Sequence, residues 1–114
     1  MLFMILLALP LALAAPLNPR TAGEITYYHP GLGACGDNHG DGDMVAAVSA
    51  AIFDADRPCG KTVKVKGDAG ETTVTVVDRC ADCPEFDIDL SPTAFKKAVG
   101  ALSVGRGKGS WSFE

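Results

Sequence analysis

The sequence has no excess of positive charge. Its 114 residues carry 10 lysines and arginines against 14 aspartates and glutamates, a formal net charge of −4. Proteins that bind nucleic acid or anionic membranes need a basic surface that neutralises phosphate groups. The lysines are instead interleaved with acids, which is typical of an ordinary solvated surface. We therefore expect neither nucleic acid nor a membrane as a partner.

The sequence also lacks a hydrophobic run long enough to span a membrane, which takes about 20 apolar residues. Its longest apolar stretch lies at the N-terminus, where residues 1–15 hold no charge and end in the small residues that a signal peptidase accepts. Pro10 inside this run argues against a buried helix. The sequence predicts a signal peptide over residues 1–14, a short lead-in over 15–22 and one domain over 23–114. We expect a secreted, extracellular protein.

Several sets of catalytic and cofactor-binding residues are missing. The only histidines are His29 and His39, and no cysteine is left over as a nucleophile once the four cysteines pair. No glycine-rich phosphate motif follows a strand and opens a helix, so we expect no nucleotide cofactor. Acids alternate from Asp37 to Asp43 as in a calcium loop, but Val48 stands where an EF-hand needs glutamate. We expect neither a cofactor nor a metal.

The sequence does contain four cysteines, Cys35, Cys59, Cys80 and Cys83. An even number in a short exported chain predicts two disulfides, for which three pairings are possible. Cys80 and Cys83 also have the spacing of zinc ligands, but there is no second close pair to complete the site. A redox pair is disfavoured because such pairs lie at a helix N-terminus, whereas this one follows a predicted strand. Two structural disulfides are the favoured interpretation.

Short stretches of strand-forming residues alternate with turn residues along the chain. A helix should begin after Ser91 as N-cap, with Pro92 in its first turn and Gly100 as its stop. The glycine-rich segment 100–109 is predicted to be a loop, and Trp111 is expected in the core. Strands are predicted over residues 23–29, 45–48, 62–66, 72–77, 86–90 and 108–114, with a helical turn after residue 48. Five or six strands and one capped helix favour a closed, mainly β barrel.

Six short motifs follow one another along the chain in a specific order. They are Gly23-Glu24-Ile25-Thr26-Tyr27-Tyr28, Gly33-Ala34-Cys35-Gly36, Val48-Ser49-Ala50, Cys59-Gly60-Lys61, Val76-Val77-Asp78-Arg79-Cys80 and Asp89-Leu90-Ser91-Pro92-Thr93-Ala94-Phe95. In this combination the sequence resembles the rare-lipoprotein-A-like double-psi β-barrel, shared with the expansin N-terminal domain, barwin and many small fungal secreted proteins. The resemblance implies a six-stranded double-psi β-barrel with one or two short helices. It also implies the disulfides Cys35–Cys59 and Cys80–Cys83.

The resemblance further implies a surface groove that holds polysaccharide and is centred on Asp89. The candidate groove residues are Thr26, Tyr27, Tyr28, Asp78 and Asp89. The two tyrosines alternate on the first strand, so one faces inward and the other is available to stack on a sugar. An alternative role for Asp89 is to brace the helix that begins at Ser91, through the helix dipole. The chain departs from bacterial expansin-like proteins in having Cys80 where they carry a groove tyrosine.

Three functions are compatible with these features. The favoured one is a monomeric, secreted, expansin-like barrel that binds cell-wall polysaccharide without hydrolysing it. The alternative is a module that binds an extracellular protein, as a protease inhibitor or an apoplastic effector. The third is a glycan-cleaving enzyme with Asp89 and Asp78 as candidate catalytic acids. Cleavage requires one protonated and one ionised carboxyl, and we expect short groove loops to leave both acids close to ordinary solvated behaviour.

Overall fold

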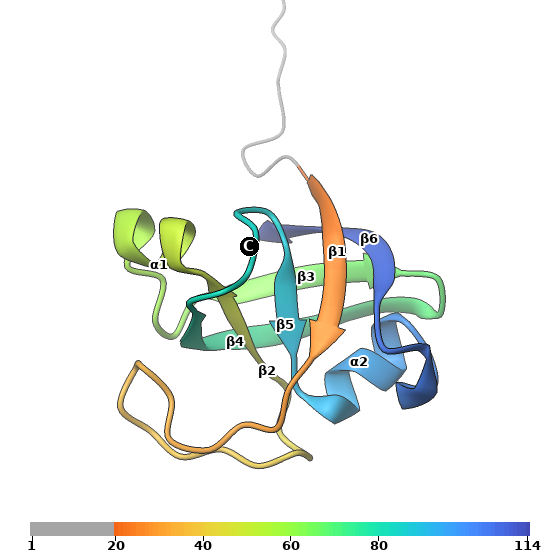
Figure 1. Ribbon diagram of the computed structural model, residues 1–114, viewed down its shortest axis with the longest axis horizontal. Helices are drawn as coiled ribbons and strands as arrows, with labels where there is room; N and C mark the ends of the chain where they lie inside the picture. Colours follow the sequence, from red (N-terminus) through yellow and green to blue (C-terminus); the bar gives the residue numbers. More distant parts are fainter. Residues whose placement is uncertain (1–19) are drawn as a thin grey trace, which may run out of the picture.

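The computed structural model of the protein describes residues 20–114, so the predicted signal peptide lies outside the described range. Six strands close into a barrel in the order β1-β5-β2-β4-β3-β6 (Figure 1). The strands are β1 (Thr21–Tyr27), β2 (Val45–Ser49), β3 (Thr62–Gly67), β4 (Gly70–Cys80), β5 (Ile88–Leu90) and β6 (Gly107–Phe113). The helices are α1 (Ala50–Asp56), α2 (Pro92–Ala98) and the 3₁₀ turn η1 (Leu102–Val104). The predicted six-stranded double-psi barrel with two short helices is confirmed.

None of the helices within residues 20–114 is long and apolar enough to cross a membrane.

The hairpin of β3 and β4 is the most local part of the barrel. Gly67 pairs with Gly70 across the turn, and the register continues to Thr62 opposite Thr75. Val63 and Val65 are fully buried on β3, while the lysine between them is not, as alternation along a half-buried strand requires. This hairpin matches the sequence prediction because both its turn and its alternation lie within one short segment.

The other strand pairs join segments that are distant in the sequence. β1 runs parallel to β5, and β2 runs parallel to β4. β2 and β5 pair antiparallel, so that these two strands link the two parallel pairs side by side. The register of β2 on β4 shifts between Ala46 and Ala47, where a β-bulge skips Val77. As a result Asp78, rather than Val77, stands opposite Ala47.

One continuous core fills the barrel, and α2 packs against it with the face that its sequence predicts. Ala94, Phe95 and Ala98 are completely buried, and Trp111 is 3% exposed, which confirms its predicted place in the core. Ser91 caps α2 by accepting a hydrogen bond from the backbone N–H of Ala94 at 3.3 Å. The remaining core residues are Ile25, Ala46, Val48, Val63, Val65, Val74, Val76, Ile88, Leu90 and Val99.

Several boundaries differ from the sequence prediction, including the ends of β4, which spans Gly70–Cys80. β1 begins two residues earlier, because Thr21 pairs with Trp111 on β6. β5 is shorter, since the Asp87 side chain accepts the hydrogen bond from the Glu24 backbone N–H at 3.0 Å. The segment 100–109 is not one loop but contains η1 and the start of β6. A glycine is needed at position 109 of β6, because a Cβ there would lie 2.2 Å from the Lys66 carbonyl oxygen of β3. The glycine thus serves close packing of two strands and does not mark a loop.

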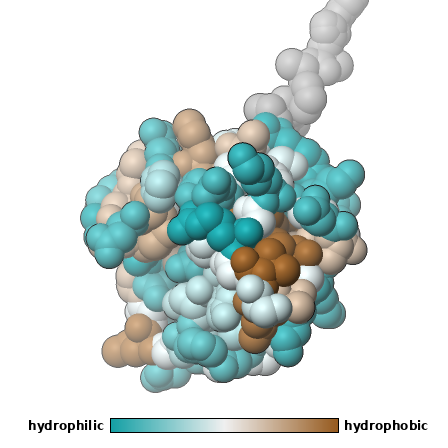
Figure 2. Space-filling model, turned by 45° about the vertical axis from the view of Figure 1, so that its right-hand side comes forward, coloured by the Kyte–Doolittle hydropathy of each residue, from teal (hydrophilic) through white to brown (hydrophobic). Residues whose placement is uncertain are grey.

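Two disulfides are present, in the pairing that the resemblance implies. Cys35–Cys59 joins the loop after β1 to the segment before β3, with Cα atoms 5.7 Å apart. Cys80–Cys83 closes the turn that follows β4, with a Cα separation of 5.4 Å. Neither bridge lies inside the barrel core, so both stabilise the loops around it. The surface view shows a mainly hydrophilic face with apolar atoms gathered in a few separate patches (Figure 2).

Candidate functional site

A row of residues crosses four neighbouring strands at one level of the barrel. Thr26 on β1 pairs with Asp89 on β5, and Asp89 pairs with Ala47 on β2. Ala47 in turn pairs with Asp78 on β4, because of the bulge described above. Side chains at the same level of neighbouring strands project from the same face of a sheet. The fold therefore brings Thr26, Asp89 and Asp78 together, although β1 and β5 are about 60 residues apart in the sequence.

Ala47 separates the two acids of this row. Neighbouring strands lie about 4.8 Å apart, so the Asp78 and Asp89 backbones are separated by roughly 10 Å across β2. Ala47 is small and only 3% exposed, so it separates the two acids without itself reaching the solvent. Sequence reasoning did not single out Ala47. Its only signal was a small residue in an otherwise apolar strand, which has no meaning until the strand order is known.

The Asp89 carboxylate is held from one side by Thr26. The Thr26 hydroxyl donates a hydrogen bond to Asp89 Oδ1 at 3.0 Å. Burial raises the pKa of Asp89 above its ordinary value, and the negative charge of Asp78 acts in the same direction. The Thr26 hydrogen bond and the positive charge of Arg106 oppose that shift. The expectation of ordinary solvated behaviour is therefore wrong for Asp89, because the short loops expected to leave it in water still remove much of its solvent.

Asp78 is held by backbone groups instead. Its Oδ1 atom accepts hydrogen bonds from the backbone N–H groups of Ala34 and Arg79, each at 2.8 Å. The first of these comes from the loop between β1 and β2, which lies against β4 at this point. Gly33 makes the approach possible, since a Cβ there would be 2.4 Å from the Val77 carbonyl oxygen. This loop therefore forms the wall of the site on its Asp78 side.

The two candidate tyrosines lie in different environments. The Tyr28 hydroxyl is buried, and has no hydrogen-bond partner among residues 20–114. Burial raises the pKa of Tyr28, and the negative charges of Asp78 and Asp89 act in the same direction. Tyr28 comes two residues after Thr26, so in extended chain the two side chains point to the same side. Tyr27 instead packs on the core, with its ring 5.0 Å from that of Phe95. The structure thus brings Tyr28 into the row with Thr26, Asp78 and Asp89, and leaves Tyr27 outside it.

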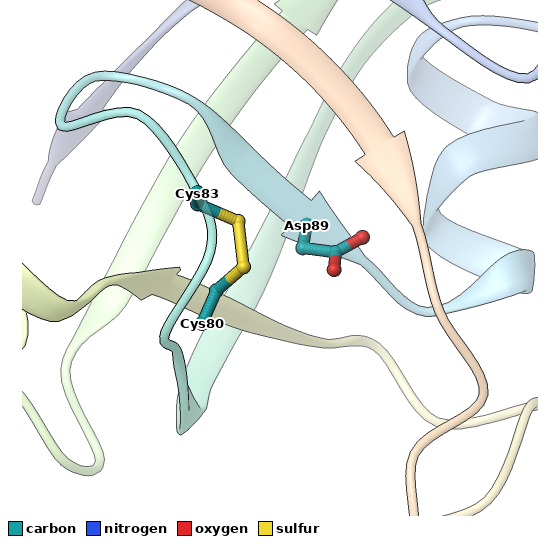
Figure 3. A group of neighbouring side chains, drawn as sticks. All are labelled: Cys80, Cys83 and Asp89. Atoms are coloured by element: carbon teal, nitrogen blue, oxygen red, sulfur yellow. A yellow bond between two sulfur atoms is a disulfide. The ribbon is translucent and has the colours of Figure 1, made fainter.

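The Cys80–Cys83 disulfide lies beside Asp89 (Figure 3). Both sulfur atoms are within 4.8 Å of a carboxylate oxygen of Asp89, a spacing that suits three metal ligands. Because the sulfurs are bonded to each other, they are not thiolates and do not supply the charge that binds zinc. The disulfide is therefore an apolar edge of the acidic row rather than part of a metal centre.

Asp87, two residues before Asp89, has a structural role. It is nearly buried, and its carboxylate lies 3.5 Å from the Arg106 guanidinium, which also binds Glu24 at 2.8 Å. This ion-pair group holds the start of β5 against β1. Arg106 of this group also supplies the positive charge that opposes the rise in the pKa of Asp89.

The fold and the acidic row together define a small double-psi β-barrel of the expansin-like class. The chain belongs to the double-psi β-barrel family described as lytic transglycolase, which it matches over residues 20–107. It is 37% identical over 98 residues to Allergen Asp f 7 of Aspergillus fumigatus, which covers 80% of this chain and 36% of the relative. It is 35% identical over 63 residues to Expansin-like protein 2 of Dictyostelium discoideum, and the match covers 51% of this chain and 16% of that relative. The chain thus spans about a third or less of these relatives.

Two solved structures are similar over most of the barrel. An expansin mutant of Clavibacter michiganensis in complex with cellohexaose superposes with a TM-score of 0.77 and 27% identity, covering 84% of this chain and 50% of that one. The Streptomyces papain inhibitor superposes with a TM-score of 0.74 and 32% identity, covering 88% of this chain and 98% of that one. The first is a glycan complex and the second is named as a protease inhibitor, so this barrel occurs in proteins with two kinds of partner.

Proposed function

We propose that this protein is a secreted, monomeric barrel that binds cell-wall polysaccharide at the row of Thr26, Asp89, Asp78 and Tyr28 without hydrolysing it. The observation that carries the proposal is the row itself, in which Thr26, Asp89 and Asp78 lie at one level of neighbouring strands. A related barrel, the Clavibacter expansin, is solved with cellohexaose bound.

The chemistry of the row suits a sugar. A carboxylate that accepts hydrogen bonds from sugar hydroxyls forms charge-assisted bonds, which are stronger than neutral ones. Thr26 already holds Asp89 in one orientation, and the backbone N–H groups do the same for Asp78, so binding orders few side chains. The disulfide supplies an apolar surface beside Asp89 where the carbon face of a sugar can pack.

The test is a titration with cellohexaose and a pull-down on insoluble cellulose, chitin and peptidoglycan. Asp89→Asn should weaken binding by at least about tenfold, because a hydrogen bond to a charged group contributes about 1.5–3 kcal/mol. Asp68→Asn is the matched control, since it removes one negative charge from the exposed turn between β3 and β4. Equal binding by the wild type and the Asp89 variant, with both folded, would place the glycan elsewhere or rule it out.

The second candidate function is the binding of an extracellular protein. It is favoured by the papain inhibitor, because that protein is covered over 98% of its length and so consists of little more than this barrel. Inhibition of papain by the purified protein, unchanged in the Asp89→Asn variant, would support this function at a surface other than the acidic row. Neither of the two measurements depends on the other, so both functions can be tested on the same preparation.

A further inference from the structure

A second concave site lies away from the acidic row, at the end of the barrel beside α1. It is a cavity of about 320 Å³ between α1, the segment before β5, and the strands β1 and β6. In Figure 1, α1, the turn after β4 and the C-terminal end of the chain lie on this side of the molecule. Thr21 lines the cavity, whereas Thr26 belongs to the acidic row; five residues of extended strand separate them by roughly 15 Å. The two sites are therefore distinct.

The floor of this cavity is aromatic. Phe86 is 48% exposed, an unusual exposure for so large an apolar side chain in this protein. Trp111 and Phe113 lie below it, in an edge-to-face arrangement with their ring centroids 5.5 Å apart. The Trp111 indole N–H donates a hydrogen bond to the Phe86 carbonyl oxygen at 2.9 Å. The floor is thus held in place from the core, and Ile52 of α1 forms one of its sides.

The rim of the cavity is acidic. Its only two charged lining residues are Asp56, at the end of α1, and Glu85, just before Phe86. Arg79 pairs with Asp54 and Arg106 pairs with Glu24, whereas Asp56 and Glu85 take part in no ion pair within residues 20–114.

One basic side chain contacts the floor of the cavity. Lys61 Nζ lies over the Phe113 ring, 5.9 Å from its centroid. Lys61 forms no ion pair with either acid of the rim. A positive group that entered above Phe86 would therefore find two carboxylates without an ion-pair partner.

We infer that this cavity binds an arginine or lysine side chain, carried on an apolar segment of an extracellular partner protein. The two carboxylates complement the positive charge, and the half-exposed Phe86 ring offers its face to a cation. The volume of the cavity, about 320 Å³, is at the lower end of the range for ligand pockets. The cavity therefore holds one or two side chains rather than a long glycan. The aliphatic stem of arginine or lysine packs well on an apolar floor such as that of Ile52 and Phe86. This inference does not rest on the proposed glycan site.

The experiment is a nuclear magnetic resonance titration of the ¹⁵N-labelled protein with two blocked pentapeptides, Gly-Leu-Arg-Leu-Gly and Gly-Leu-Gln-Leu-Gly, at low salt. The arginine peptide should shift the signals of Ile52, Phe86 and the Trp111 indole, and should bind at least fivefold more tightly than the glutamine peptide. The double variant Asp56→Asn with Glu85→Gln should lose this preference. Phe86→Ala should weaken the binding of the arginine peptide severalfold, since the aromatic surface that contacts the cation is removed.

Three controls separate this site from general electrostatics and from the acidic row. Asp68→Asn removes a charge far from the cavity and should leave peptide binding unchanged, as should Asp89→Asn. Retention of the backbone signals of barrel-core residues away from the cavity, such as Val48 and Val76, shows that a variant is folded. Equal binding of the two peptides, an equal effect of Asp68→Asn, or peptide shifts centred on Asp89 would each overturn the inference. So would shifts of the cavity signals by cellohexaose in place of the peptide, since the cavity would then be a glycan subsite.

Discussion

At the scale of single residues, Asp89 combines a fixed orientation with partial removal from water. Thr26 holds one of its oxygens, and burial raises its pKa. Sequence reasoning left open whether this residue braces α2 or binds a ligand. Ser91 itself caps α2, and the hydrogen bond that Asp89 accepts comes from β1. The contacts of Asp89 therefore join two strands and do not cap the helix.

The raised pKa of Asp89 makes a prediction about stability against pH. The ionised carboxylate is less favourable in the folded protein than in the unfolded chain, so the folded protein binds more protons through Asp89 in the pH range just above its ordinary pKa. Its contribution to the free energy of unfolding therefore falls as the pH rises through that range, and is most favourable below it. The amide of Asp89→Asn is uncharged and keeps an oxygen that accepts the Thr26 hydrogen bond.

We accordingly expect the Asp89→Asn variant to melt at the same temperature as the wild type or higher at pH 7. At pH 3 Asp89 of the wild type is protonated and neutral, as the asparagine of the variant is at any pH. The melting temperature of the variant minus that of the wild type should therefore be smaller at pH 3 than at pH 7. Thermal melts of both proteins at the two pH values check this, with Asp68→Asn as an exposed control. A clearly lower melting temperature of the variant at pH 7 would show that the charge of Asp89 is structural.

At the scale of elements, the two disulfides differ in what they constrain. Cys35–Cys59 closes a loop with a sequence separation of 24 residues, whereas Cys80–Cys83 closes one of 3 residues. On the loop-entropy description the long bridge contributes about 3 kcal/mol and the short one roughly 2 kcal/mol or less. The long bridge also holds the loop whose Ala34 backbone N–H binds Asp78. It therefore supports both the stability of the fold and one wall of the acidic row.

Replacing Cys35 and Cys59 with serine should lower the melting temperature by roughly 10–20 °C, since 1 kcal/mol corresponds to about 4–8 °C in a domain of this size. The matched variant with serine at Cys80 and Cys83 should lose clearly less. Calorimetry of the two double variants beside the wild type measures the difference. If the short bridge proved to be the more stabilising one, the loop-entropy description would not hold for this protein.

At the scale of the whole molecule, the question is whether the barrel cleaves the glycan that we propose it binds. The family that the chain matches is described as lytic transglycolase, and the raised pKa of Asp89 is a property that a general acid needs. The partner acid of the row, however, lies across Ala47 with both lone pairs of one oxygen directed at backbone N–H groups. An oxygen held in this way has no free lone pair with which to bind a water molecule or attack a sugar carbon.

We therefore expect no cleavage. Incubation of the purified protein with soluble β-glucan, chitin oligomers and peptidoglycan should release no new ends above a heat-inactivated control. Release that disappeared in both Asp78→Asn and Asp89→Asn would make the protein a glycan-cleaving enzyme. Release that neither substitution changed would come from a contaminant, because it would not depend on the acidic row.

The local features of the fold followed from the sequence alone. The β3–β4 hairpin has its turn and its alternation in one segment, and α2 carries its own cap in Ser91 and its own apolar face. The even cysteine count predicted two disulfides, and the motif order indicated the barrel and its candidate residues. The hairpin and helix signals depend on neighbours within a few positions, whereas the cysteine count and the motif order are properties of the whole chain.

Long-range pairing decided the rest. Thr26 meets Asp89, and Asp89 shares Ala47 with Asp78, only because parallel strands from distant segments are placed side by side and a bulge shifts one register. Burial of Asp89, the separation of Tyr27 from Tyr28, and the acidic cavity over Phe86 also arise from that arrangement. The sequence contains these residues but does not give the distances between them in the folded protein. Their solvation and mutual distances, which determine their chemistry, are therefore properties of the closed barrel and not of the sequence pattern.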